Sequence, residues 1–109
     1  MNRNFSQRIT VHCPEPTKLI DLISQWDDDH AAADITSYMG TRVLADRSHL
    51  GRYMIIVDFG VIDPDVSAVE EAARHNERPD TKAMVAATTA IIDGAFEYHD
   101  YDEVYRTDM

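Results

Sequence analysis

The stretch "RYMIIVDFG", residues 52–60, decides the fold of this chain. It is the most apolar segment of the sequence, with no polar residue from Tyr53 to Val57. A short apolar run of this kind is typical of a β-strand that is covered on both faces. Because alternate strand residues point to opposite faces, one face would carry Met54 and Ile56, and the other Tyr53, Ile55, Val57 and Phe59.

The segment before this strand predicts a hairpin partner for it. Residues 35–46, "ITSYMGTRVLAD", are rich in β-branched and aromatic side chains, which favour strands. Residues 47–51, "RSHLG", separate the two segments and are typical of a turn. A glycine inside a strand is typical of a β-bulge, so we expect a bulge at Gly40.

The N-terminal part predicts a strand followed by a helix. In "QRITVHC", residues 7–13, apolar and polar side chains alternate with the period of a strand. Pro14 and Pro16 prevent further sheet pairing, and Thr17 is a suitable N-cap for a helix. The next apolar residues are spaced three and four apart, as on one helical face: Leu19, Ile20, Leu22, Ile23 and Trp26.

The C-terminal half predicts a broken helical region and a last strand. Residues 63–76 form a helical pattern that ends near Asn76. Pro79 fits the first turn of a second helix, because its missing N–H costs nothing there. Gly94 would end that helix, and the aromatic-rich segment 95–106 would form the last strand.

The predicted order of elements is β-α-β-β-α-β, the ferredoxin-like α+β arrangement, in one domain spanning residues 1–109. Helices cover only one face of such a sheet, yet the strand at 52–60 is apolar on both faces. A second copy of the same sheet is the simplest cover for the other face. We therefore expect a homodimer with a two-fold interface.

Composition excludes several classes of partner. The chain has a formal net charge of -10, from 20 acidic and 10 basic residues, which repels nucleic acid and anionic membrane surfaces. No apolar run approaches the ~20 residues needed to span a bilayer, and the first residues do not resemble a signal peptide. Cys13 is the only cysteine, so no internal disulfide can form. A soluble protein of the reducing cytoplasm is expected.

Three local motifs carry a resemblance to a known family. They are a hairpin with Arg52-Tyr53 at its turn exit, Arg78-Pro79-Asp80-Thr81 at the start of the last helix, and Asp93-Gly94 before the last strand. The chain over 35–106 thereby resembles the antibiotic biosynthesis monooxygenase-like family of the dimeric α+β barrel superfamily. The resemblance implies a homodimeric α/β barrel with a pocket between the sheet and the helices of each subunit.

The same resemblance points to candidate catalytic residues. Catalytic members of the family use an Asn near the first strand and a Trp in the second helical region, and haem-degrading members add a His there. In this chain His75 and Asn76 fall in that region, whereas the one tryptophan, Trp26, lies in the first helix. We expect His75 and Asn76 to be the catalytic polar groups, with His75 as a general base. Alternatively, the two residues simply end a helix, a position that favours both types.

Aromatic and methionine side chains are candidates for the pocket wall. The expected ligand-binding residues are Trp26, Tyr38, Tyr53 and Met84, with Tyr98 and Tyr101 as further aromatic candidates. The alternative is core packing, since a tryptophan on the apolar side of an amphipathic helix is usually part of the core.

A pairing of His12 with His99 is left open. The first and last strands are expected to be antiparallel neighbours, and one register would set the two histidines opposite each other. That register also sets Asp102 opposite Ile9, which an apolar face resists. The sequence has no His-x-x-x-His, Cys-x-x-Cys or Gly-rich phosphate loop, so neither a metal nor a cofactor is expected.

Two functions therefore remain open. The first is binding of a small apolar or aromatic molecule, with cofactor-independent monooxygenation as an extension that the resemblance implies. The second is a non-catalytic homodimeric structural or interaction domain whose cavity is filled by its own side chains. An open cavity beside His75 and Asn76 would favour the first function, and packed side chains there would favour the second.

Overall fold

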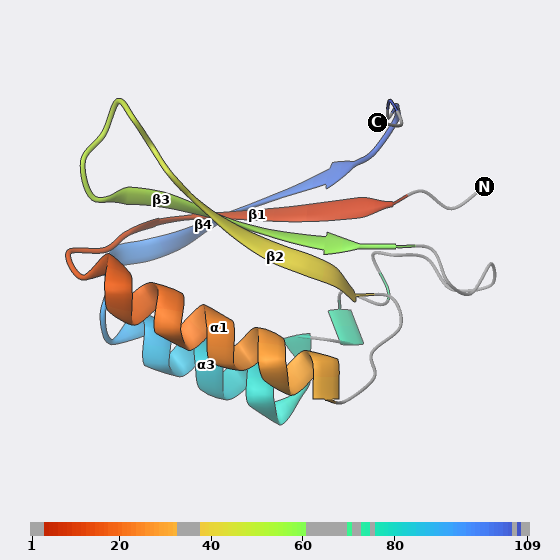
Figure 1. Ribbon diagram of the computed structural model, residues 1–109, viewed down its shortest axis with the longest axis horizontal. Coiled ribbons are helices and arrows are strands. Elements are labelled where there is room, and N and C mark those ends of the chain that lie inside the picture. Colours follow the sequence, from red (N-terminus) through yellow and green to blue (C-terminus); the bar gives the residue numbers. More distant parts are fainter. Residues whose placement is uncertain are drawn as a thin grey trace.

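The computed structural model is a four-stranded antiparallel β-sheet with helices α1 and α3 on one of its faces (Figure 1). It describes residues 4–32, 38–60, 70, 73–74, 76–105 and 107, with the side chains of residues 30–32 excepted. The elements are β1 (Phe5–His12), α1 (Pro16–Ala32), β2 (Tyr38–Ala45), β3 (Arg52–Phe59), α3 (Pro79–Thr89) and β4 (Asp93–Asp102). This order confirms the predicted ferredoxin-like α+β arrangement.

The helix boundaries differ from the predicted ones. α1 begins at Pro16, ahead of Thr17, because a proline at the first helical position lacks only an N–H that has no helical partner. α3 begins at Pro79 as predicted, but it ends at Thr89 and not at Gly94. Residues 70, 73–74 and 76 are helical and fall within the helix predicted ahead of Pro79.

The strand order is β2-β3-β1-β4, so the first and last strands are antiparallel neighbours as predicted. The register that would pair His12 with His99 is wrong, because His99 lies opposite Arg8 and His12 lies opposite Asp93. The observed register sets Tyr98 opposite Ile9. An aromatic side chain, and not a carboxylate, thus occupies this position on the helix-covered face.

Gly40 confirms the predicted β-bulge. The register between β2 and β3 shifts between Tyr38 and Gly40, and Gly40 has a φ of 122°. Residues with a side chain rarely adopt this backbone conformation, so glycine is favoured at the position. Beyond the bulge, Thr41 and Val43 lie beside α1. The bulge thus determines which residues in the rest of β2 face the helices.

The hydrophobic core lies between the helices and the inner face of the sheet. α1 contributes Leu19, Ile23 and Trp26, which recur at intervals of one helical turn and are nearly fully buried. Their partners from the sheet and the adjoining segment are Phe5, Val11, Cys13, Ile55, Val57 and Phe59. None of the helices in the described residues has the length and apolar composition needed to cross a bilayer.

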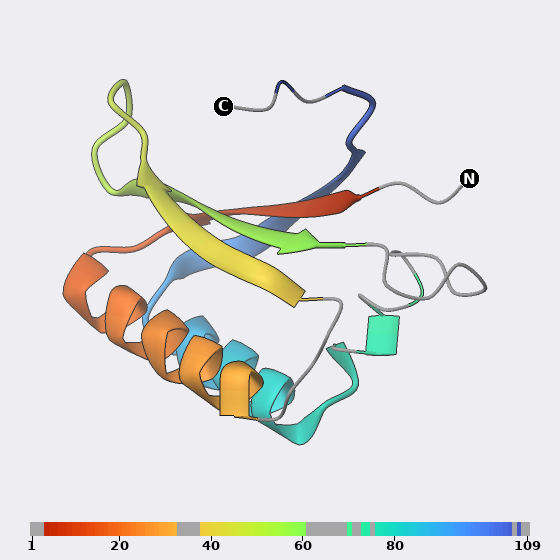
Figure 2. The same cartoon turned by 45° about the vertical axis from the view of Figure 1, so that its right-hand side comes forward.

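None of the described helices lies over the other side of the sheet, here called the outer face (Figure 2). Strand alternation places Ile56 there, yet its side chain is only 1% exposed. Arg8 and Arg42 lie on either side of Ile56 in the sheet register, and their aliphatic stems are long enough to cover it. Met54 and Ile56 share the outer face as predicted, and Arg52 and Asp58 lie beyond them on the same face of β3.

Candidate ligand-binding site

A cavity of about 470 Å³ lies between α3, β1 and β4 on the inner side of the sheet, and we call it the α3–β4 cavity. This volume falls within the usual range for small-molecule sites. Its walls combine apolar side chains with a few polar groups, as such sites commonly do. The lining residues are Gln7, Asn76, Thr81, Lys82, Val85, Ala86 and Tyr98.

Gln7 is a polar residue in an apolar row. In β1 it lies between Phe5 and Ile9, which share its face of the strand and pack in or against the core. Gln7 instead lines the α3–β4 cavity, where its carboxamide can both donate and accept hydrogen bonds. A polar residue on the inward-facing, otherwise apolar side of β1 was the sequence signal for this position. The sequence analysis did not identify it.

Tyr98 supplies the aromatic wall of the cavity from β4. It lies opposite Ile9, and its ring is tilted against that of Phe96 at 5.8 Å between centroids. Burial raises the pKa of the Tyr98 phenol above its ordinary value of 10.0. The hydroxyl therefore stays protonated at neutral pH and can donate a hydrogen bond to a bound molecule.

Asn76 lies at the opening of the cavity, just ahead of α3. The Lys82 ammonium is at the same rim and pairs with the Glu77 carboxylate at 3.2 Å. Both of these charged side chains are well exposed, so their pair contributes little to stability. His75 lies outside the described residues.

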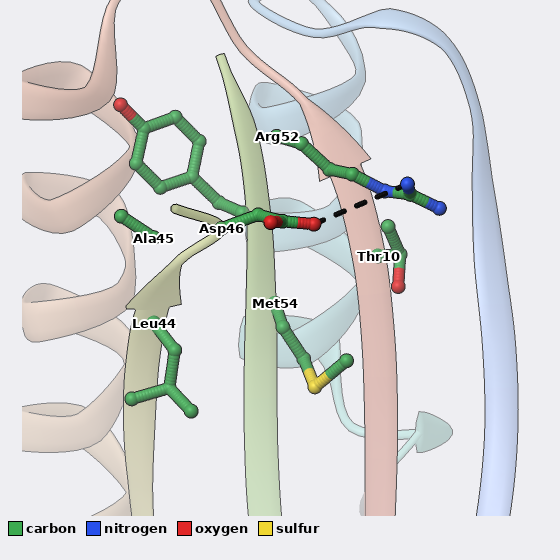
Figure 3. A pocket seen from close by; sticks show the side chains of 7 residues that line it. Thr10, Leu44, Ala45, Asp46, Arg52 and Met54 are labelled. Atoms are coloured by element: carbon green, nitrogen blue, oxygen red, sulfur yellow. Dashed lines mark ion pairs between the residues drawn. The ribbon is translucent and has the colours of Figure 1, made fainter. Parts of the chain in front are cut away.

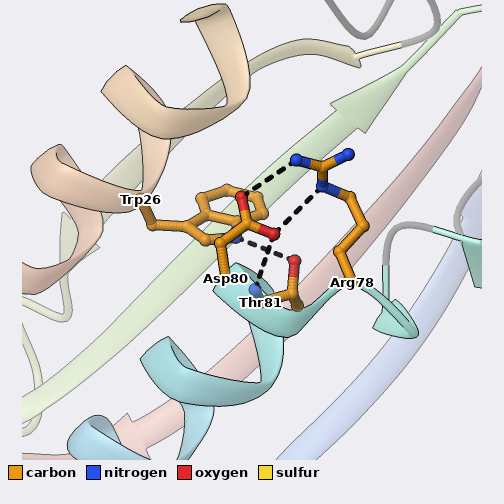
Figure 4. A network of polar contacts seen from close by, with 4 residues as sticks. All are labelled: Trp26, Arg78, Asp80 and Thr81. Atoms are coloured by element: carbon orange, nitrogen blue, oxygen red, sulfur yellow. Dashed lines mark hydrogen bonds and ion pairs between the residues drawn. The ribbon is translucent and has the colours of Figure 1, made fainter. Parts of the chain in front are cut away.

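A polar network fixes the start of α3 against α1 (Figure 4). One Asp80 carboxylate oxygen accepts hydrogen bonds from Arg78 Nε and from the Thr81 backbone N–H, each at 3.0 Å. The Trp26 indole N–H donates to the Thr81 hydroxyl, also at 3.0 Å, and both side chains are buried. Since Thr81 also lines the α3–β4 cavity, this network positions one of its walls.

The predicted wall residues do not share one cavity. Trp26 and Met84 line a smaller cavity of about 210 Å³ between the two helices. Tyr38 packs edge-on against Trp26, with their ring centroids 5.4 Å apart. Tyr53 lines a third hollow of about 360 Å³ near the turn between β2 and β3. Of the predicted site and wall residues that the structure describes, Asn76 and Tyr98 line the α3–β4 cavity, and the ligand roles of all of them stay predictions.

The Tyr38 hydroxyl donates a hydrogen bond to the Asp27 carboxylate and also contacts the Thr41 hydroxyl. Burial, followed by the Asp27 interaction, raises the pKa of this phenol well above its usual range. These contacts tie β2 to α1. The position of Tyr38 is thus explained by packing and hydrogen bonding within the subunit.

The hollow near the β2–β3 turn lies away from α3 (Figure 3). Arg52 Nη1 and the Asp46 carboxylate lie 4.0 Å apart there, with Leu44 and Met54 beside them on β2 and β3. The Ser48 backbone N–H is the main cause of a lowered pKa at Asp46, which stays ionised. No group of three or more His, Cys, Asp or Glu side chains is arranged to hold a metal ion in the part of the chain that the structure describes.

No protein-family model matches the sequence, and no curated protein matches it. Solved structures do match its fold. A candidate antibiotic biosynthesis monooxygenase from Caulobacter crescentus CB15 has a TM-score of 0.76 at 12% identity, over 95% of this chain and 92% of that one. A candidate antibiotic biosynthesis monooxygenase from Nitrosomonas europaea has a TM-score of 0.75 at 9% identity, over 99% and 97%.

A variant of SnoaB, a cofactor-independent oxygenase from Streptomyces nogalater, has a TM-score of 0.66 at 17% identity, over 94% of this chain and 93% of that one. The chain shares the fold of these three proteins. The resemblance inferred from the sequence is therefore confirmed at the level of the fold.

Proposed function

We propose that this protein binds a small apolar or aromatic molecule in the α3–β4 cavity. The observation that carries the proposal is a cavity of about 470 Å³ with an aromatic ring, aliphatic side chains and separate polar groups on its walls. Val85 and Ala86 supply apolar surface from α3, and Tyr98 supplies a ring from β4. The amides of Gln7 and Asn76 would orient the ligand through hydrogen bonds.

Cofactor-independent oxidation is the extension of this proposal. SnoaB, which shares the fold, is described as a cofactor-independent oxygenase. A base that removes a proton from a phenol with an acidic CH₂ group makes the ring electron-rich enough to react with O₂. The CH₂ becomes a carbonyl, one oxygen atom enters the product, and the other leaves as water with the two hydrogens, so no other reductant is required. His75, next to Asn76 in sequence, is the proposed base.

Replacing His75 with alanine tests this extension. We expect oxygen uptake with such a phenol to fall at least ~100-fold, as is typical for the loss of a general base. Binding of a non-reactive dye and the thermal midpoint should stay unchanged. A lower melting temperature with unchanged oxygen uptake would assign His75 a structural role instead.

We further propose that the subunit acts as a homodimer through its outer face. That face exposes Leu44 and leaves Met54 half-buried, and none of the described helices covers it (Figure 2). A second sheet would remove this apolar surface from water. Cys13 is a buried free thiol, and we place the protein in the reducing cytoplasm on that basis.

The second candidate function is a non-catalytic homodimer. Trp26 and Tyr38, expected as pocket walls, instead pack in or against the core and hydrogen-bond within the subunit. This packing favours the second candidate, in which the protein's own side chains fill the space between the helices and the sheet. The α3–β4 cavity decides between the two candidates, because only the first requires it to take up a ligand.

A matched pair of tyrosine variants tests ligand binding. Tyr98 and Tyr101 are 49% and 51% exposed on the same strand, but their positions in β4 place them on opposite faces. With Nile red as a neutral apolar probe, we expect Tyr98→Ala to weaken binding about tenfold through loss of an aromatic wall. Tyr101→Ala should leave the affinity unchanged. Equal affinities in the two variants, or no binding by the wild type, would contradict the proposed site.

A further inference from the structure

Thr81 is a buried polar residue between the helix pair and the α3–β4 cavity. Its side chain is 4% exposed, and it lines that cavity from the first turn of α3. Toward α1, its hydroxyl accepts a hydrogen bond from the Trp26 indole N–H at 3.0 Å (Figure 4). Buried donors without an acceptor are rare in folded proteins, so the partner of the hydroxyl proton matters.

The other two threonines of α3 use their hydroxyl protons within the helix. Thr88 donates to the Met84 carbonyl and Thr89 to the Val85 carbonyl, each at 2.8 Å. Helical threonines commonly form this bond to the carbonyl four residues earlier. Thr81 forms no such bond, and within the part of the chain that the structure describes its proton has no acceptor.

The bond from Trp26 restricts what the Thr81 hydroxyl can do. An indole N–H can only donate, so it occupies one lone pair of the Thr81 oxygen. The hydroxyl proton must then point away from the indole N–H. A freely rotating hydroxyl can turn either its proton or its oxygen toward a ligand, whereas this one is left mainly as a donor. A molecule in the α3–β4 cavity can supply the missing acceptor.

The other polar groups around the cavity favour the same kind of ligand. No carboxylate is among the described residues that line it, although the chain has 20 acidic residues. Lys82 is the charged residue in that lining, and its ammonium pairs with Glu77 outside the lining. The Tyr98 hydroxyl is a further donor, and it has no hydrogen-bonded acceptor in the described chain. The cavity is thus complementary to a molecule with an acceptor oxygen.

We propose that Thr81 determines which molecules the α3–β4 cavity accepts and that Trp26 is its positioning residue. The Thr81 hydroxyl donates to an oxygen of the ligand, so the preferred class is an aromatic or apolar molecule that carries a carbonyl group. Trp26 acts through Thr81, because its own side chain lines the smaller cavity between the helices. This inference rests on the proposed binding function and names the ligand chemistry of the same cavity.

Two probes of the same shape test the preference. Methyl naphthyl ketone carries a carbonyl, and in isopropenylnaphthalene a CH₂ group replaces that oxygen. Each Kd is measured by displacement of Nile red, after the Nile red Kd of each variant is known. The ratio of the hydrocarbon Kd to the ketone Kd is then compared between variants, so that the different transfer of the probes from water cancels. We expect Thr81→Val, which keeps the shape of the side chain without the hydroxyl, to lower this ratio about fivefold.

Matched variants separate specificity from packing. Thr88→Val removes a buried hydroxyl from the same helix and should leave the ratio unchanged, because the Thr88 proton is bonded to the Met84 carbonyl. Thr81→Ser keeps the hydroxyl and should keep the ratio. Trp26→Phe should give an intermediate ratio, because the hydroxyl is then present but no longer held. A purely structural role of Trp26 would weaken both probes alike and leave the ratio as it is.

Thr81→Val leaves the Trp26 indole N–H without its acceptor, which can lower stability. If circular dichroism shows that this variant does not fold, Trp26→Phe/Thr81→Val replaces it, because removing both partners of a buried hydrogen bond is much less costly. The same about fivefold fall in the ratio is expected.

The outcomes distinguish this inference from the proposed function. Equal ratios in the wild type, Thr81→Val and Trp26→Phe would overturn the inference, while displacement of Nile red by both probes would still support ligand binding. A wild type that binds neither Nile red nor the probes would overturn both. A ratio that falls in Thr81→Val but not in Trp26→Phe would keep Thr81 as the specificity-determining residue and overturn the positioning role of Trp26.

Discussion

Replacing Trp26 with alanine is expected to lower the free energy of unfolding by about 4 kcal/mol, the largest stability effect of any change considered for this chain. Trp26 is 5% exposed and contacts the ring of Tyr38. Its loss would leave a cavity between α1 and the sheet. It would also leave the buried Thr81 hydroxyl without its indole donor.

Urea unfolding followed by circular dichroism measures this effect. Ile20→Ala is the control, because Ile20 lies on the same helix but is 52% exposed, and its change should stay below about 1 kcal/mol. The loss of unfolding free energy in Trp26→Phe should lie between those of the two alanine variants, because phenylalanine keeps much of the ring and loses the hydrogen bond. A Trp26→Ala loss below about 1 kcal/mol would show that this side chain is not part of the core.

Filling the α3–β4 cavity is expected to abolish ligand binding. Ala86 lies on α3, is exposed, and lines the cavity, so a tryptophan there can occupy the space without displacing buried side chains. We expect Ala86→Trp to weaken Nile red binding at least ~100-fold, which corresponds to about 2.8 kcal/mol. The melting temperature should change little, because the position is at the surface.

Ala90→Trp is the matched control for this variant. Ala90 caps the end of α3, is exposed, and lines none of the cavities described above. The same substitution there adds equal apolar surface without filling the site. If Ala86→Trp binds Nile red as tightly as Ala90→Trp does, the dye binds elsewhere and the proposed site is wrong.

The fold was predictable because several local patterns agree with one another. The apolar run in β3, the alternation in β1 and the glycine bulge in β2 each correspond to a strand in the structure. Pro79 correctly predicted the start of α3, since its ring favours the first helical turn. The β1–β4 register was not predictable, because the predicted and the observed registers differ by an even number of residues along β1 and direct the same β4 side chains to each face. The alternation pattern therefore does not distinguish the two registers, and tertiary packing does.

The candidate site was less predictable because a cavity depends on which side chains leave space unfilled. Trp26 was a plausible wall from its type alone, but its place on the apolar stripe of α1 directs it into the core. Ala86 and Val85 carry no chemical signal in the sequence, and they line the cavity through the packing of α3 on the sheet. Asn76 and Tyr98 were predicted as candidate site residues, and Gln7, a polar residue in an inward-facing position, offered a further signal.

Native mass spectrometry of the protein purified from its source cells tests the central claim most directly. The account predicts a dimer that carries an added mass on the order of a few hundred daltons, the size that such a cavity accommodates. The Ala86→Trp variant, expressed in the same cells, should give the same dimer without that mass. A bare wild-type protein, or equal occupancy in both forms, would contradict ligand binding in the α3–β4 cavity.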